Sequence, residues 1–190
     1  MKFFVEKAAF LKALSHGQNI VEKKTTIPIL SHILLEAKED KLYLTTTDFD
    51  TSLQETIPGK VDVEGAVCVS AHLMHDIVRK LSDRSLVEIE ANPDNNQIIV
   101  KSGRSRFELS YLLAKDFPQI TQTELQNEFV LTKAQLKEVI DQTEASMCIN
   151  DSRFNVCALL MHSVTIDGKP KLRFVSTDYH RMACVELDAP

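Results

Sequence analysis

The sequence predicts an α+β fold in which helix-plus-antiparallel-strand units are repeated and the helices lie on one face of the sheets. Only three segments have helical periodicity, whereas most other segments are short, rich in β-branched residues and bounded by turn residues. Each helix is followed by about three strands, an order that indicates antiparallel meanders rather than alternating strands and helices. In addition, one part of the sequence repeats another.

The three predicted helices run from Lys7 to Val21, from Ser70 to Leu81 and from Thr132 to Glu144. Ser70 is a favourable N-cap residue, and the third helix begins with a capping-box pattern, Thr132 followed by Gln135 three residues later. A polar stripe on the second helix consists of His72, His75 and Arg79. The residues expected in the core are Phe10, Leu14, Gly17 and Val21 in the first helix, Leu73, Ile77 and Leu81 in the second, and Leu136, Val139, Ile140 and Thr143 in the third.

The predicted strands lie between turn signals such as Pro58-Gly59 and Asp167-Gly168. They cover residues 27–35, 42–46, 53–57, 66–69, 87–91, 97–101, 107–112, 153–162, 172–176 and 182–187.

An internal repeat is the most informative feature of the sequence. The pattern of residues 3–14, with Phe3, Val5, Lys7, Ala8, Phe10 and Leu14, matches that of residues 129–140, with Phe129, Leu131, Lys133, Ala134, Leu136 and Ile140. Residues 41–49 match residues 171–179, and a weaker copy of the helix-plus-strands unit lies around residues 70–112. We infer a repeat unit of about 60 residues that is used in pairs.

The repeat predicts the domain organisation. Residues 1–125 contain two units and form a first domain, and residues 126–190 contain one unit, the first half of a second domain. The partner of the third unit would begin where the sequence stops, so we expect the chain to be a piece of a longer protein.

The composition limits the possible classes. With 190 residues, 44% of them hydrophobic and 26% charged, the chain is not disordered. No apolar run reaches the roughly 18–20 residues that cross a bilayer, and Glu6 and Lys7 interrupt the apolar N-terminus. We expect a cytoplasmic protein that does not contact a membrane. The cysteines are scattered without a metal-binding spacing and are expected to be small buried hydrophobes: Cys68, Cys148, Cys157 and Cys184.

The net charge of −5 is unevenly distributed. The first predicted helix and its following turn carry +3, the second helix to Arg84 carries +1 and the third carries −1, which leaves −8 for the rest of the chain. The cations of the first helix region are Lys7, Lys12, Lys23 and Lys24. An acidic body with a basic helical surface would attract a phosphate backbone to one face. A solvated helix face that binds nothing explains the same pattern, so charge alone leaves both interpretations open.

Three other sequence patterns contain residue types that occur in catalytic or binding sites. Ser176, Asp178 and His180 lie close together in sequence, but they fall on one predicted strand segment and no nucleophile-elbow motif is present. His72 and His75 have the helical spacing of metal ligands, but no cluster of further ligands accompanies them. Arg104 and Arg106 share one strand face beside Gly103, which suits a phosphate or a protein interface. No cofactor-binding motif is found, and none of these patterns predicts a metal or a cofactor.

Several segments together resemble one family, the bacterial DNA polymerase III beta subunits or sliding clamps. They occur in the family's order and at its spacing across essentially all 190 residues, and they are Thr26–Leu30, Leu44–Asp48, Ser102–Phe107, Asp116–Pro118 and Thr177–Ala183.

The resemblance implies a DNA clamp fold of three domains, each of two units, that dimerises head to tail into a ring. This chain would contain the first domain and half of the second, and the third domain would be absent. The implied function is in DNA replication, as a processivity factor that encircles duplex DNA without reading its sequence. It would tether the DNA-directed DNA polymerase, a transferase, and catalyse nothing itself. The implied partners are duplex DNA, and DNA polymerase III and the clamp loader through short peptide motifs; no cofactor is implied.

The resemblance also implies roles for individual residues. The DNA-binding residues, with Arg79 added from the charge pattern, are Lys24, His72, Arg79, Asn150, Phe154 and Asn155. The partner-peptide groove would be lined by Arg153, Val156, Thr177, Tyr179, His180, Arg181 and Met182. The dimer interface would contain Arg104, Arg106 and Leu109. Three residues depart from the family pattern: His72 stands where an arginine is usual, Tyr179 replaces a glycine, and Asn155 replaces a tyrosine whose ring would stack on DNA.

Two alternatives stay open at this point. One is a hydrolase that acts through Asp178 and His180, and the other is an interaction module that never forms a ring. Because only one side of the implied ring interface is present in the chain, we expect the isolated chain to be monomeric.

Overall fold

The computed structural model describes residues 1–21, 26–118, 129–148 and 154–188. It divides into two compact units, unit 1 (Met1–Gln122) and unit 2 (Thr123–Pro190), which are described separately below. Within the described residues, no helix is both long and apolar enough to cross a membrane.

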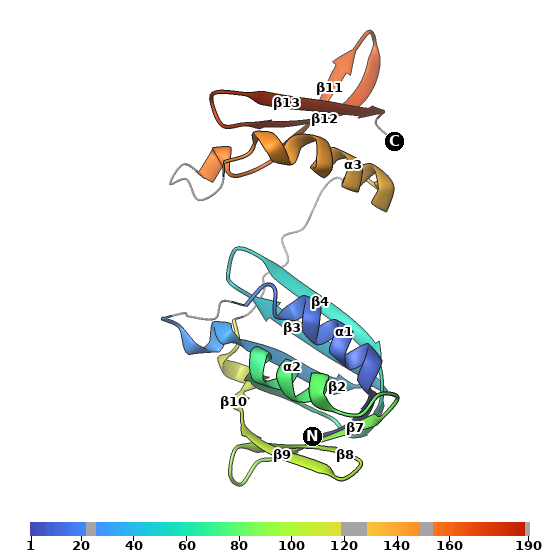
Figure 1. Cartoon of the computed structure of the whole chain (residues 1–190), viewed down its shortest axis with the longest axis vertical. Coiled ribbons are helices and arrows are strands. Elements are labelled where there is room, and N and C mark those ends of the chain that lie inside the picture. The colour runs from blue at the N-terminus through green and yellow to red at the C-terminus, as the bar shows by residue number, and fades with distance from the viewer. Residues whose placement is uncertain (22–25, 119–128, 149–153, 189–190) are drawn as a thin grey trace. The chain divides into compact units, whose positions relative to one another are not determined.

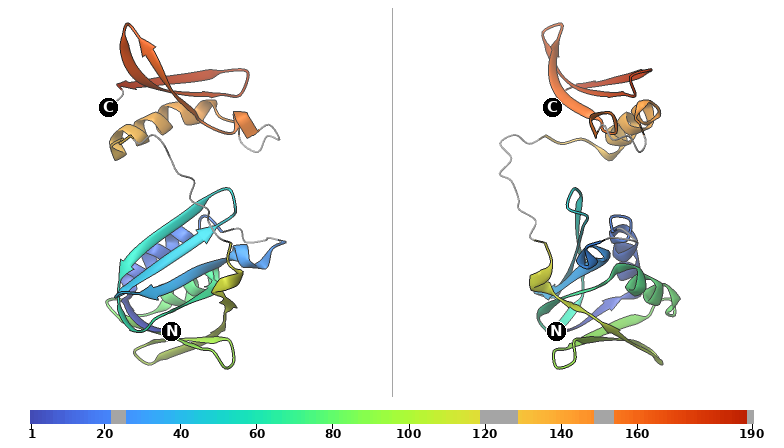
Figure 2. Two further views of the ribbon diagram at one scale, coloured as in Figure 1. Left: turned by 180° about the vertical axis from the view of Figure 1, so that it is seen from behind. Right: turned by 90° about the vertical axis from the view of Figure 1, so that its left-hand side faces the viewer.

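Unit 1 contains two five-stranded antiparallel sheets and two helices, α1 (Lys7–Gly17) and α2 (Ala71–Lys80). The helices lie side by side in front of the strands in Figure 1, and the reverse view in Figure 2 shows the strands in front. The first sheet has the order β5-β1-β7-β8-β9, formed by Lys60–Val63, Lys2–Glu6, Leu86–Asn92, Gln97–Ser102 and Ser105–Ser110. The second has the order β10-β6-β2-β3-β4, formed by Leu112–Leu113, Gly65–Ser70, His32–Lys38, Lys41–Thr47 and Ser52–Pro58.

The two sheets reveal an internal two-fold relation within unit 1. The chain order of one strand, one helix and four strands occurs twice, first as β1-α1-β2-β3-β4-β5 and then as β6-α2-β7-β8-β9-β10. Exchanging each strand for its counterpart in the other half converts the order of one sheet into that of the other. Each sheet therefore contains strands from both halves, because β1 pairs with β7 while β6 pairs with β2.

The core of unit 1 lies between the helices and the sheets. Strands β1, β7 and β8 alternate buried and partly exposed residues, as expected for strands with one face on a core. The largest fully buried side chains include Phe3, Phe10, Leu14, Ile33, Leu35, Met74, Ile89 and Ile98.

Two predictions about the helices of unit 1 need correction. Leu73 was expected in the core but is 50% exposed, and Met74 and Val78 are buried instead. Both rows of residues have helical spacing, so only the packing of α2 shows which row faces inward. The first helix ends at Gly17 rather than at Val21, although Val21 is still buried.

The strand predictions for unit 1 missed β1 and β5, and they placed the start of β2 too early. Residues 28–31 form a 3₁₀ turn that begins with Pro28, and the strand begins at His32. Proline suits the first turn of a helix, since it has no N–H to donate and its φ is already helical.

Unit 2 consists of α3 (Lys133–Thr143) on a three-stranded sheet of order β11-β12-β13, formed by Leu160–Ile166, Lys169–Thr177 and Met182–Asp188. The capping box is confirmed, because Gln135 N donates to Thr132 Oγ1 (3.2 Å) and Thr132 N donates to Gln135 Oε1 (3.0 Å). The buried core consists of Val139, Leu172 and Phe174.

Two side chains of α3 contradict the predicted core. Val139 and Thr143 are buried as expected, but Leu136 and Ile140 are exposed. The predicted strand at 153–162 also begins only at Leu160, since residues 154–156 form a 3₁₀ turn.

The cysteines differ in how far they are buried. Only Cys68 is buried, and burial raises the pKa of its thiol to about 12. Cys157 and Cys184 are exposed, contrary to the prediction, because both lie in unit 2, whose buried core is small.

The position of Lys7 contradicts the prediction that it belongs to the basic helical surface. Its side chain is buried, and Nζ donates to the backbone oxygen of Leu81 (2.6 Å) and to Asp83 Oδ1 (2.7 Å). The hydrogen bond from Lys7 also lowers the pKa of the Asp83 carboxyl group. Lys7 therefore ties the start of α1 to the segment that follows α2, and it is not available to a ligand.

We expect Lys7→Met to destabilise unit 1 by about 1–3 kcal/mol, because the Leu81 carbonyl loses its donor in a buried place. Urea unfolding monitored by circular dichroism measures this change. Lys12→Met is the matched control, since Lys12 is on the same helix but exposed. Equal stability of the two variants would show that the buried ammonium group is not a structural anchor.

Candidate nucleic-acid interface and peptide site

The exposed side of α1 and α2 forms a polar hollow of about 470 Å³ in unit 1. It is lined by Gln18, Asn19, His72, His75, Asp76 and Arg79. The predicted polar stripe of α2 thus meets the residues that follow the end of α1. Sequence reasoning missed Gln18 and Asn19, because neither has a charge or a motif that marks it.

Hydrogen bonds position several of these side chains. Ser15 Oγ lies 3.2 Å from His75 Nε2, which joins the two helices. Arg79 Nη2 donates to Asp76 Oδ1 at 3.2 Å, one turn earlier on α2, and both side chains remain exposed. His72 Nε2 is buried and has no hydrogen-bond partner among the described residues. The exposed guanidinium group of Arg79, rather than this buried ring nitrogen, is the cation that an anionic ligand in the hollow would meet.

The cations of the sheets differ from those of the helices. On the first sheet, Lys2 Nζ lies 3.0 Å from Glu88 Oε1, and Lys101 Nζ lies 3.4 Å from Glu90 Oε2. Within the part of the chain that the structure describes, Lys12 and Lys80 on the helices form no ion pair. Lys12 and Lys80 are therefore cations that a polyanion can neutralise, whereas Lys2 and Lys101 of the first sheet are already paired.

The structure brings together only two of the predicted DNA-binding residues. His72 and Arg79 line the same hollow. Lys24 and Asn150 lie outside the described residues, and Phe154 is described only in its backbone. Asn155 is exposed in unit 2.

Of the three residues predicted for the dimer interface, two are exposed and one is buried. Arg104 and Arg106 are exposed at β9, and Arg106 Nη2 lies 2.7 Å from Glu108 Oε1. Leu109 is only 6% exposed and belongs to the core of unit 1, so its side chain does not reach a surface. Alternation along the strand explains the error, because Leu109 points to the face opposite its exposed neighbours. β9 is the last strand of its sheet, and its outer edge is open within unit 1.

The predicted peptide residues centre on the turn between β12 and β13. Thr177 Oγ1 donates to the backbone oxygen of Arg181 (2.8 Å) and accepts from Tyr179 N (3.1 Å). Asp178 Oδ1 accepts from the backbone N–H groups of His180 (3.0 Å) and Arg181 (2.9 Å), and Arg181 Nε donates to Asp178 Oδ2 (2.9 Å). The two backbone donors, that of Arg181 first, lower the pKa of the Asp178 carboxyl group to about 2.

Unit 1 contains the same turn at the repeat-equivalent position. Thr47 Oγ1 donates to the backbone oxygen of Thr51, and Asp48 Oδ1 accepts from the backbone N–H groups of Asp50 and Thr51. The threonine and aspartate are therefore turn-forming residues of the repeat.

The described geometry gives the hydrolase interpretation no support. The carboxylate of Asp178 is occupied by its own turn, and Ser176 Oγ donates to the backbone oxygen of Thr143 (2.7 Å) in a buried place. Both groups are committed to backbone partners, as expected for residues that stabilise a turn and a helix end rather than for members of a catalytic triad.

Tyr179 connects two parts of the predicted peptide site. Its backbone has φ of 71°, a conformation that favours glycine, and its ring is exposed. Asn155 Nδ2 donates to Tyr179 Oη at 3.5 Å, so the 3₁₀ turn and the β12–β13 turn approach each other here. Thr177, His180, Arg181 and Met182 are at least partly exposed nearby, whereas Arg153 lies outside the described residues. Val156 is only 1% exposed, which corrects its assignment to the groove surface.

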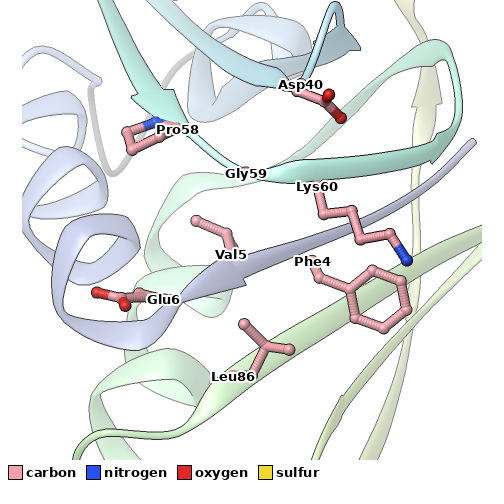
Figure 3. Close-up of a pocket in the computed structure, with 8 residues that line it drawn as sticks. All are labelled: Phe4, Val5, Glu6, Asp40, Pro58, Gly59, Lys60 and Leu86. Carbon is pink, nitrogen blue, oxygen red and sulfur yellow. The ribbon is translucent and has the colours of Figure 1, made fainter.

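A second hollow in unit 1, of about 630 Å³, was not predicted from the sequence. Figure 3 shows its lining residues, Phe4, Val5, Glu6, Asp40, Pro58, Gly59, Lys60 and Leu86. Lys60 Nζ lies 5.7 Å from the centre of the Phe4 ring, a cation–π contact at the rim. Within the described residues, neither this hollow nor any other place gathers three or more histidine, cysteine, aspartate or glutamate side chains that could hold a metal.

Comparisons of the sequence with known proteins identify its family. The family model of the DNA polymerase III beta subunit, N-terminal domain, matches residues 1–121. The beta sliding clamp of Caulobacter vibrioides strain NA1000 is 39% identical over 190 residues, which are 100% of this chain and 51% of that protein. The beta sliding clamp of Proteus mirabilis is 35% identical over 189 residues, 99% of this chain and 50% of that protein.

Solved structures of sliding clamps have the same fold as this chain. The DNA polymerase sliding clamp from Caulobacter crescentus has a TM-score of 0.96 at 39% identity, covering 100% of this chain and 51% of that chain. The DNA polymerase III subunit beta from Pseudomonas aeruginosa has a TM-score of 0.90 at 33% identity, covering 100% of this chain and 50% of that one. The chain spans about half the length of these relatives. It has the clamp fold, and it belongs to the DNA polymerase III beta subunit family.

Proposed function

We propose that this chain forms part of a sliding clamp, a processivity factor that holds duplex DNA and tethers the replicative polymerase in the cytoplasm. The observation that carries the proposal is the charge arrangement of unit 1. Lys12 of α1 and Lys80 of α2 form no ion pair within the described residues, and Arg79 of α2 stays exposed beside Asp76. On the first sheet, by contrast, Lys2 and Lys101 are paired with glutamates.

The proposed contact with DNA uses phosphates and no base edges. Arg79 and the two histidines of α2 lie at the surface hollow, where a phosphate could approach them. Contacts of this kind position a duplex but carry no sequence information. A clamp that encloses its DNA does not need tight binding, so a small number of exposed cations is sufficient and still permits sliding.

Unit 2 supplies the proposed docking site for partner peptides. Side chains of the β12–β13 turn hydrogen-bond to the turn's own backbone, and the turn exposes Tyr179, His180 and Met182 to solvent. In the full ring, DNA polymerase III and the clamp loader would bind here through short motifs. The open edge of β9 with Arg104 and Arg106 would serve the head-to-tail homodimer. The proposed protein has no catalytic activity of its own.

For DNA, we expect weak binding to any duplex that falls steeply with salt concentration. Arg79→Ala should weaken binding about two- to fivefold at low salt and reduce the slope of log K against log salt by about one, because one phosphate contact is lost. Fluorescence anisotropy with two unrelated labelled duplexes measures both quantities.

The control variant is Arg173→Ala, whose guanidinium group on β12 lies 2.6 Å from Glu186. Equal loss in both variants, or strong preference for one duplex, would contradict the proposed DNA contact.

For partner peptides, we expect Tyr179→Gly to strengthen binding of a clamp-binding peptide about three- to tenfold. The change removes an exposed ring from the turn and places glycine where φ is positive. A nuclear magnetic resonance titration follows even weak binding.

Phe49→Gly is the matched control, since Phe49 has φ of 78° and an exposed ring at the equivalent turn of unit 1. If Tyr179→Gly leaves the peptide affinity unchanged or lowers it, the ring is not an obstacle in the groove.

A further inference from the structure

We propose that the second hollow of unit 1 binds an extended peptide segment of a partner protein, in which an apolar side chain is flanked by a basic one. The apolar side chain would enter the hollow, and the basic side chain would reach the carboxylate of Glu6. The inference does not depend on DNA binding or on the β12–β13 turn of unit 2.

The hollow belongs to unit 1 alone. All the residues that line it lie between Phe4 and Leu86, and both halves of this unit are present in the structure. In the first sheet, β7 and β8 separate β1 from β9, so the hollow is not part of the strand edge proposed for the ring. Its openness is therefore a property of unit 1 itself.

Alternation along β1 places the hollow on the face of the first sheet that lies away from the helices. Phe3 and Val5 are 0% and 1% exposed and belong to the core, so Phe4 and Glu6 face the other way. Leu86 of β7 lies opposite Glu6 and is 56% exposed. A segment bound here would not overlap with the polar hollow of α1 and α2.

The internal two-fold relation of unit 1 identifies the equivalent place in its second half. β5 pairs with β1 so that Lys60 lies opposite Phe4, and β10 pairs with β6 so that Leu112 lies opposite Cys68. Cys68 is therefore the equivalent of Phe4.

The second half covers this place with its own chain. Cys68 is 0% exposed, and its Sγ lies 3.9 Å from the backbone oxygen of Leu113. The 3₁₀ turn Ala114–Asp116 contacts β6, and Phe117 after it is buried. In the first half, the chain continues from β5 directly into β6 of the other sheet. Phe4 is left partly exposed where the second half has a peptide segment with apolar side chains.

Gly59 forms one wall of the hollow. A Cβ atom at this position would lie 2.8 Å from the backbone oxygen of Phe4, so no side chain fits here. Gly59 N donates to the backbone oxygen of Asp40 (3.0 Å), and Val61 N donates to Asp40 Oδ1 (3.0 Å). These hydrogen bonds hold the wall in place and leave the space beside it for a ligand.

The carboxylates indicate the charge of the segment. Within the described ranges, Glu6 and Asp40 form no ion pair, whereas Lys60 Nζ lies 3.3 Å from Asp62 Oδ1. In Figure 3, the carboxylate of Glu6 lies at the opposite end of the hollow from Lys60 and the Phe4 ring. A basic side chain beside Glu6 would complement a charge that the chain itself leaves unpaired.

The hollow continues beyond Glu6 and Leu86, which also line an adjoining hollow of about 390 Å³. Lys7 lies there, but its ammonium group is already bound to Asp83. Arg84 lies there too, and in the described part of the chain no ion pair joins it to Glu6. Two hollows that share two residues form a groove longer than one side chain, which suits an extended peptide.

The probe is the synthetic peptide acetyl-Lys-Ser-Phe-Ser-Lys-amide. In an extended chain its phenylalanine and both lysines lie on one side, so it fits the groove in either direction. Nuclear magnetic resonance titration of the 190-residue chain should give saturable shifts at Phe4 and Leu86 and none at Tyr179. Replacing the phenylalanine of the peptide by serine should weaken binding about three- to tenfold, because the ring no longer leaves water.

The proposal is overturned if no saturable shift occurs at Leu86, or if the serine peptide binds equally well. Leu86→Ser should remove the difference between the two peptides, since it shortens the apolar wall. Leu86 is largely exposed, so the variant is expected to fold, and circular dichroism checks this.

Glu6→Gln should weaken binding of the probe about two- to fivefold at low salt, because an exposed ion pair is lost. Glu36→Gln is the matched control, since Glu36 is an exposed glutamate on β2 of the other sheet. Equal loss in the two variants would show that the negative charge of the whole chain attracts the peptide, and not the groove.

Two other occupants give different results, and either result would overturn the proposal. If the small aromatic amine phenethylamine binds at Leu86 as tightly as the peptide, the hollow is a site for a small molecule. If the chain dimerises in sedimentation velocity and Leu86→Ser abolishes the dimer, the occupant is a second copy. Loss of DNA binding in the earlier experiment would leave all these results unaffected.

Discussion

Pairing between half-units is the physical constraint on which this structure depends. A single helix on a few strands can bury one row of helix residues against its own sheet, but the adjacent row and the outermost strand edges need a second half. In unit 1 the halves satisfy each other by exchanging β1 and β6 between the sheets. The large core, the adjacent helices and the shared polar hollow all follow from this exchange.

The constraint explains which features were predictable from sequence. Local signals were sufficient for the capping box at Thr132, the Ser70 cap and the repeat itself, because each depends on residues close in the chain. Leu136 and Ile140 were predicted to be buried from periodicity that α3 does possess. Their exposure depends on whether a second half covers them, which the pattern within one helix does not contain.

In the candidate site, too, some residues were located correctly from the sequence and others were placed wrongly. His72 and Arg79 were identified from their spacing on one helix, and they line one hollow. Lys7 was counted as a surface cation, yet it is buried through a contact with Asp83, which is remote in sequence. Val156 and Leu109 were assigned to surfaces by position in the family pattern, although both side chains point inward. Long-range packing decides such cases, and no local pattern reports it.

The turn at Asp178 shows why a cluster of reactive residue types need not be a reactive site. An aspartate that accepts two backbone N–H groups is held ionised and oriented by its own loop. The same arrangement at Asp48, where no histidine follows, shows that the repeat requires the turn and not a reaction. A turn held by the same threonine and aspartate hydrogen bonds can present different side chains at its tip without altering its backbone. This explains how the two copies keep one geometry while Phe49 and Tyr179, and the residues after them, have diverged.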